Sequence, residues 1–252
     1  ASSLHVGSLL QIMILKLMQK HGHRPIILLG GGTTLIGDPS GKDTTRKMLG
    51  NEEIKKNIDS IKKVFNKILD TTNKNTSPIF VNNAEWLTKL KYIDFLRDVG
   101  SHFTINKMLT FDSVKLRLDR EQSLSYMEFN YMMLQAYDFY ELNKRHKCIL
   151  QIGGSDQWGN IVSGIELNRR ESKTQCFGIT VPLITKSDGT KFGKTESGSV
   201  WLDSKKTSPY MFYQFWLRVE DEDVYKFLNF FTFLSEEYIQ QVKINDESSE
   251  NK

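Results

Sequence analysis

Cysteine is scarce in this sequence: Cys148 and Cys176 are the only two among 252 residues. Two isolated thiols exclude the disulfide scaffold of a small secreted protein, and neither has a nearby Cys or His that would suggest a zinc site. No apolar run approaches the roughly 20 residues needed to span a bilayer, and the first residues do not resemble a signal peptide. We therefore expect an intracellular protein with no membrane contact and no structural metal.

The sequence also has only a small excess of positive charge, with a formal net charge of +4. This value is only a weak indication of an anionic partner. Between residues 51 and 70, isoleucines and one phenylalanine recur at helical spacing, and lysines fill the intervening positions. Such a pattern predicts an amphipathic helix, and a solvated lysine face explains it better than a nucleic-acid contact.

Short apolar runs alternate with longer helical patterns, which is typical of an α/β protein with a parallel sheet covered by helices. Strands are expected at residues 25–29, 79–81, 148–152, 179–184 and 200–202. Helices are expected at residues 8–20, 52–69, 93–99, 113–118, 127–143 and 157–170. After Asp203 the strand pattern stops, and helices are expected at residues 209–219, 222–231 and 235–242. We therefore expect an all-helical unit from about Thr207, with a disordered tail from Asn245.

One predicted helix carries three polar residues on a single stripe. Tyr131, Gln135 and Asp138 are spaced i, i+4 and i+7 among mostly apolar neighbours. Ser125 and Glu128 form the capping box S-x-x-E, which marks the start of this helix. Buried hydroxyl, amide and carboxylate groups need hydrogen-bond partners, and these can come either from the protein or from a small polar ligand.

Three glycine-containing loops follow predicted strands, at residues 30–42, 153–160 and 186–195. In doubly wound folds, ligands bind at the carboxyl ends of the strands, where glycine lets the backbone approach phosphate. None of the three loops matches the phosphate-binding GxxxxGK[ST] pattern or the GxGxxG fingerprint. Ordinary ATPase and dehydrogenase functions are therefore not supported.

Five motifs together carry a family resemblance. They are HVGS at residues 5–8, GDPSGK at 37–42, YMMLQAYD at 131–138, LQIGGSDQWGN at 150–160 and KFGKT at 191–195. In this order they closely resemble the bacterial-type tyrosyl-tRNA synthetases, which are class I aminoacyl-tRNA synthetases. The resemblance implies a Rossmann-like doubly wound parallel sheet in a catalytic domain at residues 1–206. It also implies a helical connective insertion at about 83–147 and the start of a helical anticodon-binding domain at 207–252.

The activity implied by this resemblance joins L-tyrosine to ATP, supplied with Mg²⁺, and then transfers the tyrosyl group from tyrosyl-adenylate to tRNA(Tyr). Because the tyrosine carboxylate is itself the nucleophile, the protein has to align it on the α-phosphate and neutralise the growing charge. The catalytic residues implied are His5, Lys42, Arg46, Lys191, Lys194 and Thr195. Those implied for tyrosine are Asp38, Tyr131, Gln135, Asp138 and Gln157. Those implied for ATP are His5, Gly7, Ser8, Gly154, Asp156, Leu183, Ile184 and Lys194.

Within these sets, Asp138 is expected to accept from the substrate phenol. Ser8 stands where the family signature H-x-G-H has its second histidine. Plainer explanations remain for several positions: a surface histidine at His5, a helix cap at Asp156, and solvated lysines in the KFGKT loop.

The resemblance also predicts partners and departures. The sequence begins beyond the strand and the Y-x-G-x-D motif of the family, so we expect a chain of this length to form tyrosyl-adenylate poorly. A homodimer is expected through the insertion, and Arg169 and Arg170 are expected near the tRNA acceptor arm or as plain helix-end charges. The dimer candidates, which a core role explains equally well, are Phe95, Phe103, Met108 and Leu109. The compartment is the cytoplasm or, alternatively, an organelle such as the mitochondrion. A tryptophanyl-tRNA synthetase and a non-catalytic RNA-binding relative are the competing functions.

Overall fold

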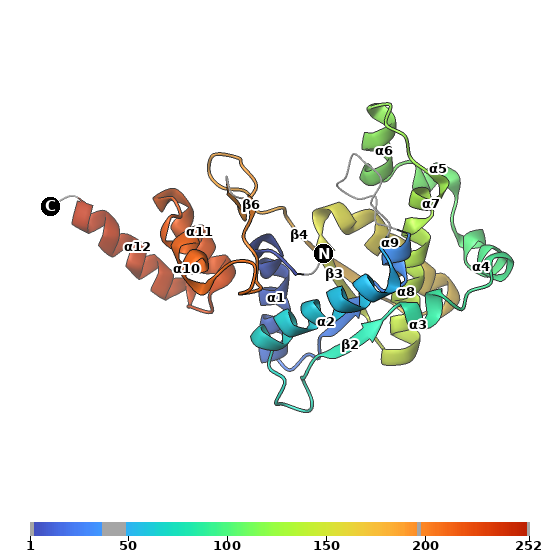
Figure 1. Ribbon diagram of the computed structural model, residues 1–252, viewed down its shortest axis with the longest axis horizontal. Coiled ribbons are helices and arrows are strands. Elements are labelled where there is room, and N and C mark those ends of the chain that lie inside the picture. Colours follow the sequence, from blue (N-terminus) through green and yellow to red (C-terminus); the bar gives the residue numbers. More distant parts are fainter. Residues whose placement is uncertain (1–2, 37–48, 196–197, 251–252) are drawn as a thin grey trace. The chain divides into compact units, whose positions relative to one another are not determined.

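The computed structural model describes residues 3–36, 49–195 and 198–250 (Figure 1). The chain forms two compact units, each built from segments that are far apart in the sequence. Unit 1 comprises Ala1–Pro25, Ser60–Ser77 and Leu183–Lys252, and unit 2 comprises Ile26–Asp59 and Pro78–Pro182.

Parallel strand pairs form the centre of unit 2. Strand β1 (Ile26–Leu29) pairs with β2 (Ile79–Asn82), and β3 (Leu150–Gly154) pairs with β4 (Phe177–Val181). Within the described residues these strands make two separate pairs. Parallel neighbours need a long crossover, and the helix α9 (Trp158–Glu171) supplies it between β3 and β4. The expected α/β class with parallel strands and many helices is confirmed.

Helix α8 (Tyr131–His146) packs closely along α9. The ring of Phe139 is fully buried, and a Cβ atom on Gly164 would lie only 2.9 Å from its Cδ1 atom. Glycine at position 164 therefore permits the close approach of the two helices. The other helical segments of unit 2 are η2 (Thr33–Leu35), α3 (Ala84–Leu87), α4 (Tyr92–Asp98), η3 (Gly100–His102), α5 (Ile105–Met108), α6 (Asp112–Asp119), α7 (Tyr126–Phe129) and η4 (Ser155–Gln157).

The helix predicted at residues 127–143 is divided in two. The capping box of Ser125 and Glu128 is present, but it begins the short helix α7, and Asn130 separates α7 from α8. The Glu128 carboxylate also accepts from the buried Arg117 guanidinium at 3.0 Å, and Arg117 in turn donates to the carbonyl oxygen of Ser123. These buried contacts tie the first turn of α7 to Arg117, and the apolar pattern alone does not reveal them.

Unit 1 contains η1 (Val6–Ser8), helix α1 (Leu9–Lys20) and a small antiparallel pair, β5 (Lys194–Thr195) with β6 (Gly198–Ser199). Its last three helices are α10 (Pro209–Leu217), α11 (Asp221–Phe231) and α12 (Glu236–Glu250). Helix α2 (Asn51–Ile68) has residues in both units. The expectation of a disordered tail from Asn245 is wrong for residues 245–250, because α12 extends to Glu250.

An aromatic cluster forms part of the core of unit 1. The buried Phe192 ring lies with its centroid 4.4 Å from that of Phe227, 5.2 Å from Phe215, 5.6 Å from Trp216 and 5.5 Å from Phe231. These contacts join the KFGKT loop to α10 and α11. A domain boundary near residue 207 remains a prediction. In the part of the chain that the structure describes, every helix is too short or too polar to cross a bilayer.

Candidate active site

Asp138 points into the interior of unit 2, and the residue is only 2% exposed. The indole Nε1 of Trp86 donates to its Oδ1 at 2.7 Å, and the amide Nδ2 of Asn83 donates to its Oδ2 at 2.9 Å. Burial raises the pKa of Asp138 to about 7, although these two hydrogen bonds oppose the shift; the nearby charge of Glu141 adds to it. Near neutral pH, the Asp138 carboxyl group therefore exists in both its charged and its neutral form.

Asn83 and Trp86 were not identified from the sequence. Both follow β2, at the carboxyl end of a parallel strand, where ligand-binding residues gather in this class of fold. Their position directly after a predicted parallel strand is the sequence feature that could have identified them. Protein partners thus satisfy part of the hydrogen-bonding capacity of Asp138, and each carboxylate oxygen has a further lone pair. Asp138 lines neither of two cavities in the described chain, one around Trp201 and one around Phe103.

The amide of Asn83 extends this network to the loop after β1. Its Oδ1 accepts from the backbone N–H of Gly32 at 2.7 Å, and its Nδ2 also donates to Oγ1 of Thr33 at 3.0 Å. The segment η2 is therefore tied to the Asp138 carboxylate through one buried side chain. Three residues expected in the active site, Asp38, Lys42 and Arg46, lie outside the described residues.

The structure brings Gln135 and Gln157 together through a residue that the sequence did not single out. Nδ2 of Asn160 donates to Oε1 of Gln135 at 3.0 Å and to Oε1 of Gln157 at 3.2 Å. Nε2 of Gln157 in turn donates to Oδ2 of Asp156 at 3.2 Å. Tyr131, one turn before Gln135 on α8, is half-buried.

The glycine block places its residues between β3 and α9. A Cβ atom on Gly153 would lie 3.1 Å from Cβ of Gln157, so this glycine permits a tight approach. Gly154 has extended backbone and precedes η4. Asp156 is exposed, and neither η4 nor α9 has a side-chain cap. The alternative that Asp156 caps the following helix is therefore wrong.

In unit 1, His5 is the N-cap residue of η1, and its side chain folds back on the motif. Its Nδ1 accepts from the backbone N–H of Gly7 at 3.0 Å, so the neutral imidazole carries its proton on Nε2. A Cβ atom at position 7 would lie 2.8 Å from Cε1 of His5. Glycine at position 7 therefore permits this placement of the ring, and the half-buried Ser8 follows it.

The HVGS and KFGKT motifs meet within unit 1. Gly193 has φ +86°, and a Cβ atom on it would lie 2.7 Å from Cγ1 of Val6. Val200 donates its backbone N–H to Gly193 at 3.0 Å and accepts from Val6 at 2.8 Å. Lys191 is exposed, whereas the structure describes only the backbone of Lys194 and Thr195.

The expectation that Leu183 and Ile184 end a strand is wrong, because β4 ends at Val181. The next residue is Pro182, which has no N–H to continue the ladder. Leu183 is 62% exposed, whereas Ile184 is 6% exposed and its carbonyl oxygen accepts from the backbone N–H of Phe192 at 3.0 Å. Of the two, only Leu183 has a side chain open to a ligand.

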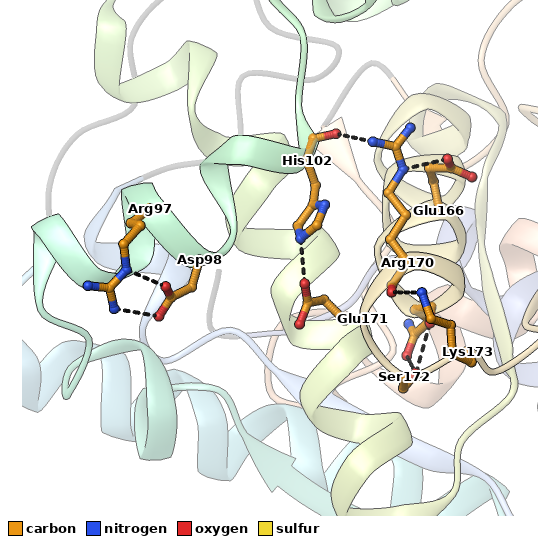
Figure 2. A network of polar contacts seen from close by, with 9 residues as sticks. Arg97, Asp98, His102, Glu166, Arg170, Glu171, Ser172 and Lys173 are labelled. Atoms are coloured by element: carbon orange, nitrogen blue, oxygen red, sulfur yellow. Dashed lines mark hydrogen bonds and ion pairs between the residues drawn. The ribbon is translucent and has the colours of Figure 1, made fainter.

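Arg169 and Arg170 lie at the end of α9 and both bind Glu166. Arg169 Nη2 is 2.8 Å and Arg170 Nε 2.7 Å from Oε1 of Glu166, and the hydrogen bonds from the two guanidinium groups lower the pKa of Glu166 to about 2. Figure 2 shows Arg170 also reaching the carbonyl oxygen of His102, whose ring contacts Glu171. Arg169 and Arg170 therefore form ion pairs at the end of the helix, and their role in tRNA binding remains a prediction.

The four dimer candidates divide between core and surface. Met108 is buried, and Phe95 and Phe103 pack against buried clusters, whereas Leu109 is exposed. Met108, Phe95 and Phe103 therefore contribute to the core of this chain.

Comparisons with known proteins give consistent results. The sequence model of the family described as "tRNA synthetases class I (W and Y)" matches residues 1–252. A tyrosine–tRNA ligase of Pelagibacter ubique (strain HTCC1062) is 65% identical over 243 residues, which cover 96% of this chain and 59% of that protein. A tyrosine–tRNA ligase of Wolbachia from Brugia malayi (strain TRS) is 56% identical over 96% of this chain and 58% of its own length. The chain thus spans less than two thirds of the length of these relatives.

Among solved structures, a C-terminally truncated mitochondrial tyrosyl-tRNA synthetase of Aspergillus nidulans matches with a TM-score of 0.82 and 29% identity. The match covers 100% of this chain and 74% of that one. A tryptophanyl-tRNA synthetase of Plasmodium falciparum matches with a TM-score of 0.67 at 12% identity, over 99% of this chain and 66% of the other, which shows a shared fold only.

Proposed function

The chain belongs to the class I tRNA synthetases of the tryptophan and tyrosine group, and we propose that it serves the ATP-dependent activation of L-tyrosine and its transfer to tRNA(Tyr). The observation that carries the choice of tyrosine is the buried Asp138 carboxylate, held by Trp86 and Asn83. The relatives that are 65% and 56% identical and bear the name tyrosine–tRNA ligase support the same choice.

In this proposal the tyrosine phenol donates its O–H to Asp138. The two existing donors stabilise the carboxylate form, which is the form that accepts from a phenol. Phenylalanine has no hydroxyl group, so it would place an apolar edge against a buried carboxylate without a new hydrogen bond. Gln135, with Tyr131 and Asp38, binds the ammonium group, and Gln157 binds the carboxylate.

ATP enters as the co-substrate together with Mg²⁺. In the described residues no cluster of three or more His, Cys, Asp or Glu side chains is placed to hold a metal ion, so we treat Mg²⁺ as part of the substrate. Gly154 and Asp156 bind the ribose, and the exposed Leu183 contacts adenine. His5 donates Nε2–H to phosphate beside Gly7 and Ser8, consistent with the tautomer set by Gly7.

The remaining catalytic groups neutralise negative charge on the α-phosphate and on pyrophosphate. Lys191, Lys194 and Thr195 do so from the KFGKT loop, and Lys42 and Arg46 do so from the GDPSGK loop. Positive charge that meets the phosphates more strongly in the transition state than in the ground state raises kcat.

The proposal includes two macromolecular partners. Arg169 and Arg170 both pair with the carboxylate of Glu166, so two positive charges face one negative charge. The excess positive charge can bind the phosphates of the acceptor arm of tRNA(Tyr). A second copy of the chain is expected on the apolar surface of the insertion, where Tyr92, Ile93 and Tyr126 are exposed. We place the reaction in the bacterial cytoplasm because the most similar relatives reported above come from bacteria.

ATP–pyrophosphate exchange with purified full-length protein tests the function. We expect exchange with tyrosine and little exchange with phenylalanine or tryptophan. Asp138→Asn replaces the acceptor with an amide of the same shape and should reduce exchange with tyrosine by at least about tenfold. Exchange that tryptophan supports as well as tyrosine would overturn the choice of substrate.

A further inference from the structure

Three amide side chains meet in unit 2 at Asn160. This residue lies in the first turn of α9 and is 4% exposed. Its Nδ2 donates one hydrogen bond to Oε1 of Gln135 on α8 and one to Oε1 of Gln157, which precedes α9. Both N–H bonds of one buried amide are therefore used on two different glutamines.

These contacts determine which end of each glutamine faces away from Asn160. An amide side chain has an oxygen that only accepts and a nitrogen that only donates. Since Asn160 donates to both oxygens, the nitrogen of Gln157 is directed away from Asn160. There it donates to Oδ2 of Asp156 at 3.2 Å, and as an NH₂ group it can donate to a substrate carboxylate as well. The oxygen of Gln135 keeps a second lone pair, which can accept from an ammonium group.

The position of Asn160 is itself fixed by packing. Its neighbour Ile161 is fully buried, and Gly164 permits close contact between α9 and Phe139 on α8. The packed helix pair consequently fixes the backbone positions from which Gln135 and Asn160 extend toward each other. Orientation that exists before a ligand arrives lowers the entropy cost of binding.

We propose that Asn160 is a positioning residue that orients Gln135 and Gln157 for the ammonium and carboxylate groups of the amino-acid substrate. This inference rests on the proposed function. Asn160 acts through the two glutamines, so its removal should affect recognition of the two charged groups more than recognition of the phenol.

Binding of three ligands, measured by calorimetry on the full-length protein, tests the inference. Tyrosine carries both charged groups, tyramine lacks the carboxylate, and desaminotyrosine lacks the ammonium group. The variants are Asn160→Ala and Asn160→Asp. The matched control is Asn168→Ala. Asn168 is another buried asparagine on α9, but its side chain donates to the carbonyl oxygen of Gly164 and accepts from Ser172, both on or next to the same helix.

Asn160→Ala should weaken tyrosine binding by about tenfold, with a smaller loss for each analogue, because each analogue uses only one of the two glutamines. In Asn160→Asp the carboxylate can only accept, so both glutamines turn their nitrogen toward it and their oxygen toward the ligand. Tyrosine and desaminotyrosine should then lose affinity by about tenfold or more, whereas tyramine binding is retained. Asn168→Ala should change all three affinities by the same small factor.

An equal loss for all three ligands in Asn160→Asp, or an Asn160→Ala result that matches Asn168→Ala, would overturn the inference. If Asn160→Ala fails to fold, as judged by circular dichroism, Asn160→Asp decides the question because it preserves the side-chain shape. Failure of the unmodified protein to bind tyrosine at all is a different result, and it would count against the proposed function.

Discussion

The indole nitrogen of Trp86 lies 2.7 Å from Oδ1 of Asp138, at the end of a short polar path that begins at the surface. The guanidinium of Arg145 lies over the Trp86 ring at 5.0 Å and pairs with the buried carboxylate of Glu141 at 2.5 Å. Asp138, Glu141 and Arg145 follow one another at i, i+3 and i+7 on α8, so one helix face aligns the three charges.

Trp86→Phe keeps an aromatic ring in place and removes only the N–H donor. We expect the affinity for tyrosine to fall by about tenfold, because the Asp138 carboxylate loses one of its two donors. Calorimetric titration with tyrosine measures the change. Trp158→Phe is the control, because Trp158 is exposed and lies on α9; an equal loss in both variants would contradict the role of the hydrogen bond.

Arg145→Ala leaves the buried Glu141 carboxylate without its ion-pair partner. The uncompensated negative charge should raise the pKa of Asp138 further, so that less of it is ionised at neutral pH. We expect tyrosine affinity to be reduced at about pH 7 and to recover toward about pH 8.5, where Asp138 loses its proton. Titrations across this range should show no such recovery for Arg169→Ala, which removes an exposed arginine on α9.

Stability should depend on the titration of Asp138. The pKa of this residue is raised from 3.8 to about 7 by burial, so the folded protein holds the proton more tightly than the unfolded chain. The free energy of unfolding should therefore fall as pH rises from about 4 to about 7, by roughly 1.4 kcal/mol per pH unit at most from this group. Urea unfolding at several pH values measures the slope, and Asp138→Asn should have a smaller one.

Gly193→Ala and Gly189→Ala separate backbone strain from a steric clash. Both glycines have positive φ, +86° and +80°, but a Cβ atom on Gly193 would meet Val6 at 2.7 Å, whereas one on Gly189 meets nothing within 4 Å. We expect Gly189→Ala to cost about 1 kcal/mol of stability through strain alone. Gly193→Ala should cost more and should also reduce pyrophosphate exchange, because the KFGKT and HVGS motifs are forced apart. Equal thermal unfolding and equal exchange in the two variants would contradict this.

Periodicity predicted the elements that carry the site better than it predicted the contacts within it. The spacing of Tyr131, Gln135 and Asp138 placed all three on one helix, which α8 confirms. Asn130 interrupts the predicted helix with φ −77° and ψ −8°, and the apolar pattern carries no signal for this interruption. The same helical assignment could not reveal that Asp138 was already bound by protein donors.

Asn83, Trp86 and Asn160 were missed for a related reason. Each acts on a residue at least 25 positions away in the sequence, and only tertiary packing creates these pairs. The end of β4 was locally readable, because Pro182 follows the last paired residue. The apolar run continues past that proline, so apolar character alone extends the predicted strand to Ile184, beyond the last paired residue.

The hydrogen bonds of Asn83 restrict which residues natural variants of this chain can carry at position 83. Its oxygen accepts from Gly32, and its nitrogen donates to both Thr33 and Asp138. Aspartate at position 83 would lose the donors and place a second negative charge beside Asp138, and leucine would leave the N–H of Gly32 and the Asp138 oxygen unsatisfied. Natural variants that conserve Asp138 should therefore retain the amide at position 83, even where the surrounding surface has changed freely.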